Sequence, residues 1–408
     1  MSTRREEMAN ESRKTKGRVR FLTKDGAPVA NATVNVKLTN HEFLFGCGGF
    51  DAINRTEDEP SEFFIDRMNK WTDLCNYGTM SFYWGQFEPE EGKPKTESRM
   101  RASKFLVEHG AKVKGHPLCW HTACANWLME YDNKTILEKQ LARINRDVSE
   151  FKGVIDMWDV INEVVIMPVF DRYDNAITRI CKQYGQVNLV KEVFDAAKAA
   201  NPDSVLLIND FNLSDKYAEL IDKCLEAGVP ISAIGLQTHQ HQGYMGLAKL
   251  EEILKRFEKF GLPLHFTENT LVSGHIMPAH IVDLNDYQIP EWPSTPEGEE
   301  RQAREMKEMY TYLFDHPLVE AITGWDFSDG KWLGAPSGVI RKDNSLKPSY
   351  EMLKHLVKEE WTTNATLKTD EAGYIEFDGY RGDYAATIDG RDVSFKLSKT
   401  GKDIECVI

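Results

Sequence analysis

Eight apolar, strand-like runs alternate with amphipathic stretches from about residue 43 to residue 358, and this alternation restricts the fold more than any other feature. The stretches between the runs carry apolar residues at helical spacing, for example 136–151, 188–200, 215–228 and 246–261. This alternation predicts a parallel α/β domain. The eight runs are FLFGC (43–47), LCNYGT (74–79), AKVKGHPLCW (111–120), IDMWDVIN (155–162), SVLLINDF (204–211), SAIGLQT (232–238), PLHFTEN (263–269) and EAITGWDF (320–327).

The number of units separates two parallel α/β architectures. Eight units in roughly 300 residues match the size of a (β/α)8 TIM barrel. An open, doubly wound sheet is the alternative, and the chain has no GxGxxG motif of the kind that such sheets use for dinucleotides. We therefore expect the barrel.

The segments on either side of the barrel region have a different character. The first contains two alternating strands around an Asp-Gly turn, and the last contains several short strands with Gly and Asp-Gly between them. Neither is large enough to fold alone. A barrel begins its first strand and ends its last helix on the same face, so both segments emerge together, and we expect one small accessory β-domain rather than two independent extensions. The expected division is 1–16 disordered or loosely ordered, 17–40 and 361–408 in the β-domain, and 41–360 in the catalytic barrel.

The charge and the apolar content of the sequence limit the kinds of partner that the protein can bind. A net charge of −14 argues against nucleic acid and anionic membranes, and no run of about 18 apolar residues is present to span a bilayer. The amino terminus lacks the apolar segment of a secretory signal, and seven cysteines without CxxC spacing predict reduced thiols. We expect a cytoplasmic protein with a neutral substrate and no cofactor, and the sequence leaves its oligomeric state open.

Polar and aromatic residues gather at the predicted strand ends, where barrel enzymes place catalytic groups. Two of them are carboxylates, Glu163 and Glu268, on different strands. Glycoside hydrolysis needs such a pair, because one carboxyl protonates the leaving oxygen while the other attacks the anomeric carbon. Tryptophan faces suit sugar rings, and amides and imidazoles suit hydroxyls. The other residues at strand ends are His116, Trp120, His121, Gln237, His239, Trp325 and Asp326.

Six motifs in order resemble those of the family 10 glycoside hydrolases, best known as endo-β-1,4-xylanases. They are KGHPLCWHT (114–122), WDVINE (158–163), LLINDFNL (206–213), IGLQTHQ (234–240), HFTEN (265–269) and GWDFSDGKW (324–332). The resemblance implies that Glu163 is the acid/base and Glu268 the nucleophile of a retaining, double-displacement mechanism, with carboxyl groups about 5 to 5.5 Å apart. It also implies supporting or sugar-binding roles for His116, Trp120, Asn162, Gln237, His239, Trp325 and Trp332.

Two departures from the family pattern bear on the substrate. After the second strand the family usually has Glu-Asn-x-x-Lys, whereas this chain has Met80 and Tyr83 at the Asn and Lys positions, so we expect weaker hydrogen bonding there and count Tyr83 among the substrate residues. The segment 270–299 is longer than the family's turn and is expected to close one side of the cleft. Xylan or xylo-oligosaccharides are the expected substrates, and the choice between endo and exo action stays open.

Three alternatives remain. A related retaining β-glycosidase would act on another short or decorated β-linked oligosaccharide. A non-catalytic sugar-binding barrel would keep the cleft but lose a glutamate, and both are present here. A metal-dependent hydrolase is suggested by His239-x-His241 and Asp326, but such sites need several converging ligands. We expect no metal site.

Overall fold

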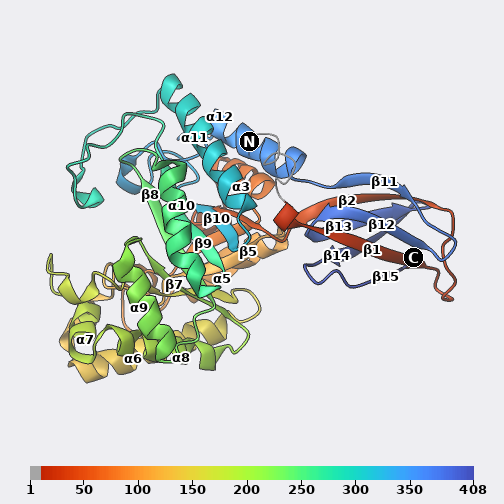
Figure 1. The fold of residues 1–408 in the computed structure, drawn as a ribbon. Coiled ribbons are helices and arrows are strands. Elements are labelled where there is room, and N and C mark those ends of the chain that lie inside the picture. Colours follow the sequence, from red (N-terminus) through yellow and green to blue (C-terminus); the bar gives the residue numbers. More distant parts are fainter. Residues whose placement is uncertain (1–10) are drawn as a thin grey trace.

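The computed structural model describes residues 11–408, which form a barrel domain and a smaller β-domain that projects from it (Figure 1). The barrel is a closed parallel sheet in the order β10-β3-β4-β5-β6-β7-β8-β9, so the predicted TIM barrel is confirmed and the open sheet is wrong. Closure comes from β10 pairing with β3, where Ala321 lies opposite Leu44. The strands are β3 (Leu44–Gly48), β4 (Tyr77–Ser81), β5 (Lys112–His116), β6 (Met157–Asn162), β7 (Val205–Asp210), β8 (Ala233–Gln240), β9 (Leu264–Leu271) and β10 (Val319–Gly324).

Helices surround this sheet, and some of them begin at a capping side chain. The side chain of Asp132 accepts a hydrogen bond from the backbone of Thr135 at the start of α6, and Thr295 caps α11 in the same way with Pro296 at its first turn. None of the helices in the described part of the chain is long and apolar enough to cross a membrane. The helices are α2 (Ala52–Arg55), α3 (Glu62–Leu74), α4 (Trp84–Phe87), α5 (Thr96–Glu108), α6 (Asn133–Glu150), α7 (Ala176–Tyr184), α8 (Gln186–Ala200), α9 (Asp215–Glu226), α10 (Gly246–Phe257), α11 (Pro296–Asp315) and α12 (Pro348–His355).

The strand bounds differ from those of the apolar runs, and two of the differences have a clear local cause. Leu74 closes α3 instead of opening the second barrel strand. The chain turns at Asn76, whose side-chain amide bonds to the backbone of Phe45 and Phe43, so β4 starts only at Tyr77. The next strand, β5, ends at His116, since Pro117 has no N–H to continue a ladder.

The barrel interior changes from apolar to polar along its axis. Its amino-terminal end is filled by an apolar plug that includes Leu44, Tyr77, Met157, Leu207, Ala233 and Ala321. Further along, Lys114 and Asp159 are buried and form an ion pair at 2.7 Å. A buried ion pair costs desolvation that a hydrophobic pair would not, so its position directly beneath the carboxyl-end mouth points to a role there.

The accessory β-domain contains strands from both ends of the chain, as predicted. One sheet has the order β12-β1-β15 and the other the order β11-β2-β13-β14. Its strands are β1 (Lys14–Leu22), β2 (Thr33–His41), β11 (Asn364–Lys368), β12 (Tyr374–Tyr380), β13 (Gly382–Ile388), β14 (Arg391–Leu397) and β15 (Ile404–Val407).

The Asp-Gly sequences have two different outcomes. Asp389 and Gly390 both adopt positive φ and join β13 to β14 as a hairpin. The turn at Gly26, by contrast, separates β1 and β2 into different sheets. The fully buried Phe21 and Val36 lie on these two strands, and two sheets can bury such side chains against each other where one hairpin could not.

The amino-terminal expectation needs a correction. Residues 1–10 lie outside the described residues, but residues 11–16 are not loosely ordered, because Lys14 begins β1. The guanidinium of Arg13 is buried and donates hydrogen bonds to the carbonyls of Phe314, His316 and Val319, the last at 2.6 Å. These carbonyls lie where α11 leads into β10, so Arg13 fixes the β-domain to the amino-terminal face, away from the mouth (Figure 1).

Candidate active site

Glu163 and Glu268 lie at the carboxyl ends of β6 and β9 and share an unusual backbone conformation. Their φ angles are 56° and 57°, in the left-handed region that side chains other than glycine seldom occupy. At Glu268 the cause is a bulge, because Gln237 and His239 of β8 pair with Thr267 and Thr270 of β9, which leaves one extra residue in β9. Bulges re-aim side chains near active sites.

A chain of side-chain hydrogen bonds connects the two glutamates. Asn162 donates to Oε1 of Glu163 at 3.3 Å and accepts from Nδ2 of Asn209 at 2.8 Å. The same Nδ2 of Asn209 donates to Oε1 of Glu268 at 2.8 Å. We call Asn162 and Asn209 the amide bridge. Gln237 supports it by donating to Oδ1 of Asn162 at 2.9 Å.

The environments of the two carboxyl groups push their pKa values apart. Burial, together with the charges of Glu268 and Asp210, raises the pKa of Glu163 to about 8. Burial also opposes ionisation of Glu268, but the neighbouring His116 and His239 outweigh it and hold the pKa of Glu268 below its ordinary value. One group is therefore poised to carry a proton while the other is ionised, as acid and nucleophile must be.

Two histidines face the carboxylate of Glu268. Nε2 of His239 lies 3.1 Å from Oε2, and Nε2 of His116 lies 3.9 Å from Oε1. Nδ1 of His116 is 2.7 Å from Oδ2 of Asp159, which the buried Lys114 also contacts. Burial opposes ionisation of Asp159, yet Lys114 and His116 keep its pKa low. The anionic Asp159 orients His116, so the ion pair inside the barrel supports the site.

Aromatic rings line the space around the carboxylates. Trp120 donates its indole N–H to Oε2 of Glu163 at 2.9 Å. The ring of Tyr83 lies 5.6 Å from that of Trp120 and 5.8 Å from His116. On the other side, the ring centroids of Trp332 and Trp325 are 4.5 Å and 6.1 Å from that of His239. Met80 is fully buried, so it presents no group to a sugar.

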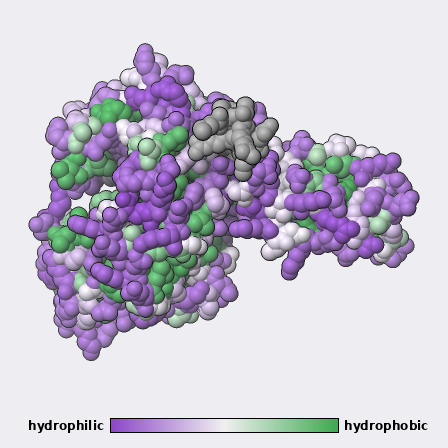
Figure 2. Space-filling model, viewed as in Figure 1, coloured by the Kyte–Doolittle hydropathy of each residue, from purple (hydrophilic) through white to green (hydrophobic). Residues whose placement is uncertain are grey.

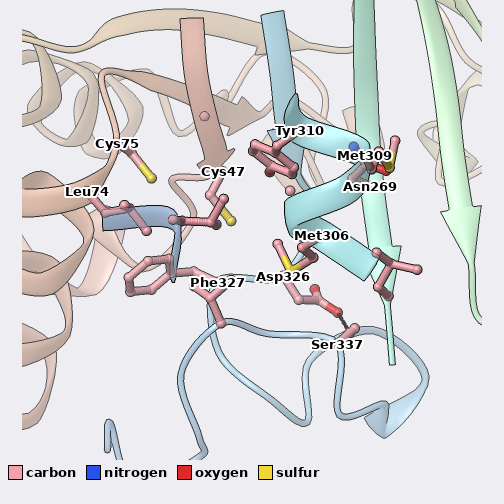
Figure 3. Close-up of a pocket in the computed structure, with 15 residues that line it drawn as sticks. Cys47, Leu74, Cys75, Asn269, Met306, Met309, Tyr310, Asp326, Phe327 and Ser337 are labelled. Atoms are coloured by element: carbon pink, nitrogen blue, oxygen red, sulfur yellow. Dashed lines mark hydrogen bonds between the residues drawn. The ribbon is translucent and has the colours of Figure 1, made fainter. Parts of the chain in front are cut away.

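Three residues at strand ends lie away from the glutamates. Asp326 turns outward to a small cavity of about 30 Å³ under α11, where it accepts a hydrogen bond from Ser337 at 2.7 Å (Figure 3). His121 is buried against Phe170, with ring centroids 4.4 Å apart. His241 bonds to Thr270. Within residues 11–408 no three His, Cys, Asp or Glu side chains are placed to hold a metal ion, so the metal hypothesis gains no support.

Sequence reasoning missed Asn209, Lys114 and Asp159. Each is polar within an otherwise apolar run, which was the available signal. The room for Asn209 depends on Gly235 of the neighbouring strand. A Cβ there would lie 2.3 Å from Oδ1 of Asn209, which is closer than real contacts allow.

A TIM barrel with two carboxyl groups of opposed pKa shift at its mouth, surrounded by tryptophan and histidine, has the arrangement that glycoside hydrolysis requires. The family model for glycosyl hydrolase family 10 matches residues 75–355. The chain belongs to glycosyl hydrolase family 10.

Two individual relatives match most of the chain. The chain is 26% identical over 328 residues to endo-1,4-beta-xylanase B of Thermotoga neapolitana, covering 76% of this chain and 88% of that protein. It is also 26% identical over 393 residues to anti-sigma-I factor RsgI6 of Acetivibrio thermocellus, covering 94% of this chain but only 46% of that longer protein.

Solved structures share the fold. Native xylanase 10B from Thermotoga maritima matches with a TM-score of 0.62 and 23% identity, over 78% of this chain and 96% of that one. Xylanase 10B from Thermotoga petrophila RKU-1 in complex with xylobiose matches with a TM-score of 0.63 and 22% identity, over 78% and 95%.

Proposed function

We propose that this protein is a retaining glycoside hydrolase that cleaves β-1,4-xylosidic bonds in xylan or xylo-oligosaccharides by double displacement. The observation that supports it most is the opposed pKa shifts of Glu163 and Glu268, two carboxyl groups joined by one amide bridge. The xylose preference is supported by the relatives described as xylanases and by the neighbour that contains xylobiose.

In the first step the ionised Glu268 attacks the anomeric carbon while Glu163 gives its proton to the departing glycosidic oxygen. The carbon–oxygen bond breaks as the ester bond to Glu268 forms. In the second step the ionised Glu163 takes a proton from water, whose oxygen attacks the same carbon and releases Glu268. Both glutamates return to their starting states, and this sequence needs no metal or cofactor.

The surroundings suit a sugar on the same carboxyl face. Trp325, Trp332 and Trp120 offer flat apolar surfaces, and Tyr83 adds a fourth ring. His239, which is partly exposed, can meet a hydroxyl group, while Asn162, Gln237 and His116 are buried and support the two glutamates. Because Tyr83 replaces the lysine of the usual pattern, stacking rather than charge would hold the sugar there.

Two other functions are compatible with the same barrel. A related β-glycosidase acting on another short or decorated oligosaccharide uses the same machinery and differs only in the sugar. A non-catalytic sugar-binding barrel would keep the cleft without turnover, and one relative is described as an anti-sigma factor rather than as an enzyme. The presence of both glutamates, with their pKa values pushed apart, favours catalysis, because a binding surface has no use for that difference.

The test is a panel of defined oligosaccharides and aryl β-glycosides with product analysis. We expect cleavage of xylobiosides and xylo-oligosaccharides, and no turnover after Glu268→Gln. Cleavage of cello-oligosaccharides alone would favour the other β-glycosidase, and tight binding without cleavage would favour the binding protein. The cytoplasmic location, and the lack of nucleic-acid and membrane partners, stay predictions from charge and sequence.

A further inference from the structure

The segment 270–299, which runs from the end of β9 to the first turn of α11, folds around a small apolar core of its own. Trp292 and Met277 are almost fully buried. The indole of Trp292 stacks on His275 with ring centroids 5.2 Å apart and donates to the carbonyl of His275 at 3.0 Å. The segment is therefore a built structure that can hold its tip in a defined place.

That tip reaches the loops that follow two other barrel strands. Gln242, after β8, donates to the carbonyls of Pro278 and Ile281 at 3.0 and 2.8 Å. Arg172, in the loop that begins with Glu163, donates to Asp283 at 2.6 Å and to both carboxylate oxygens of Asp286 at 2.6 and 2.7 Å. The loops carrying the two proposed catalytic carboxylates are thus joined by ion pairs.

Between the two aspartates, Asn285 accepts a hydrogen bond at 3.3 Å from the indole of Trp332, which follows β10. In the closed eight-stranded order, β10 and β6 lie opposite each other. The short turn η5 (Leu284–Asp286) therefore bridges loops that leave opposite sides of the barrel. In Figure 1 the teal segment and the yellow-green loop after β6 project from the same side, and Figure 2 shows a hollow between the upper and lower parts there.

We propose that Arg172, Asp283 and Asp286 form an ionic latch over the mouth of the active site, which makes chain ends and short oligosaccharides the preferred substrates. The proposal rests on the proposed function for the identity of the sugar. With the latch closed, a short chain enters from one side, whereas the middle of a polymer must wait until the latch opens. The latch therefore selects by chain topology and not by the chemistry of the sugar.

The latch is placed to open without unfolding the protein. The side chains of Arg172, Asp283 and Asp286 are 44%, 36% and 55% exposed, so dissolved ions can screen the attraction between them. The base of the segment is held by the apolar core around Trp292, against which Leu284 and Tyr287 of the tip also pack. Salt should free the tip while leaving the base of the segment in place.

The first experiment compares Arg172→Ala with the wild type on linear xylan and on an aryl β-xylobioside. We expect kcat/KM on the polymer to rise at least fivefold and kcat/KM on the aryl substrate to stay within twofold. Arg179→Ala is the matched control, because Arg179, in α7, pairs with Asp174 of the same segment after β6 and so does not join two loops. Its ratio of polymer to aryl activity should not change.

The second experiment restores the latch with its charges exchanged. Arg172→Glu should open it, and the triple variant Arg172→Glu, Asp283→Arg, Asp286→Arg should return the ratio toward that of the wild type. A salt titration to 0.5 M should raise the ratio for the wild type but not for Arg172→Ala. Ratios that stay equal across all these variants and salt concentrations would overturn the latch.

An activity-independent measurement separates this proposal from the assignment of the sugar. Hydrogen exchange in peptides covering 276–290 should speed up in Arg172→Ala and in salt, and stay unchanged in Arg179→Ala. If the aryl xylobioside is not cleaved but exchange responds in this way, the proposed sugar is wrong and the latch stands. If exchange is the same in all variants, the latch is wrong whatever the substrate.

Discussion

Asn209 donates a hydrogen bond to Oε1 of Glu268 at 2.8 Å, and this bond depends on a strand neighbour that has no side chain. The same amide nitrogen also donates to Oδ1 of Asn162. The amide oxygen of Asn209 accepts a hydrogen bond from the hydroxyl of Thr267 at 2.7 Å. Both N–H groups of the amide donate and its oxygen accepts, so Asn209 has one orientation. Asn209 is a positioning residue that fixes the direction of the carboxylate.

Gly235→Ala should disturb this bond from outside the site. The added methyl would displace Asn209, and the ionised form of Glu268 would lose a donor. We expect kcat to fall at least tenfold and the acid limb of the pH–rate profile to move to higher pH. Asn209→Ser should do the same, and the double variant should lose little more than either single one. Additive losses, or an unmoved acid limb, would show that Gly235 acts only on stability.

The pH–rate profile should have limbs set by the two glutamates. Glu163 must hold its proton, so kcat/KM should fall as the pH rises through about 8. Glu268 must be ionised, so activity should persist to a pH below the ordinary pKa of glutamate before it falls. In Glu163→Ala, substrates with good leaving groups should still react at the first step, without the alkaline limb. An alkaline limb that persists in this variant would assign it to another group.

The raised pKa of Glu163 also predicts a cost in stability. The folded state favours its neutral form, so the penalty is absent below the ordinary pKa of about 4.5 and grows until the pH passes about 8. At about 1.36 kcal/mol per pKa unit, the upper bound is a few kcal/mol. Glu163→Gln should therefore raise the melting temperature at pH 8 and change it little at pH 4.5. Equal melting temperatures at both pH values would contradict the shift.

Arg13 provides a test of how the β-domain is attached. Its guanidinium donates hydrogen bonds to three carbonyl groups. Each carbonyl left without a donor would lower the free energy of unfolding by about 1–3 kcal/mol before the structure relaxes. Arg13→Ala should lower the melting temperature by several degrees and leave KM unchanged, since the contact lies on the face opposite the mouth. Arg18→Ala, which removes exposed ion pairs in the same domain, is the control and should have little effect. A selective rise in KM after Arg13→Ala would place the β-domain near the site.

The barrel and the position of its candidate carboxylate pair could be predicted because both depend on local patterns. The order of the strands follows from the order of the apolar runs in the sequence. A carboxylate directly after such a run, as at Glu163, indicates the carboxyl face of the barrel. Whether a side chain points inward depends on register, which the runs do not reveal. Asp326 follows the same rule as Glu163 and yet turns outward to Ser337.

The supporting residues depend on contacts between distant segments. Asn209 gains its role from a bulge in β9 and from space at Gly235, which belong to two other strands. The ion pair of Lys114 and Asp159 requires β5 and β6 to be placed side by side. Likewise, β1 and β2 form no hairpin, because their partners come from the far end of the chain.

The proposed double displacement requires Glu268 to form a covalent bond to the sugar. The direct measurement is mass spectrometry after incubation with a 2-deoxy-2-fluoro-β-xylobioside carrying a good leaving group, whose second step is slow. We predict a protein heavier by one fluorinated xylobiosyl group, with the added mass on the peptide that contains Glu268 and none in Glu268→Gln. Added mass on Glu163, or inactivation-free turnover to a product of inverted configuration, would contradict the account.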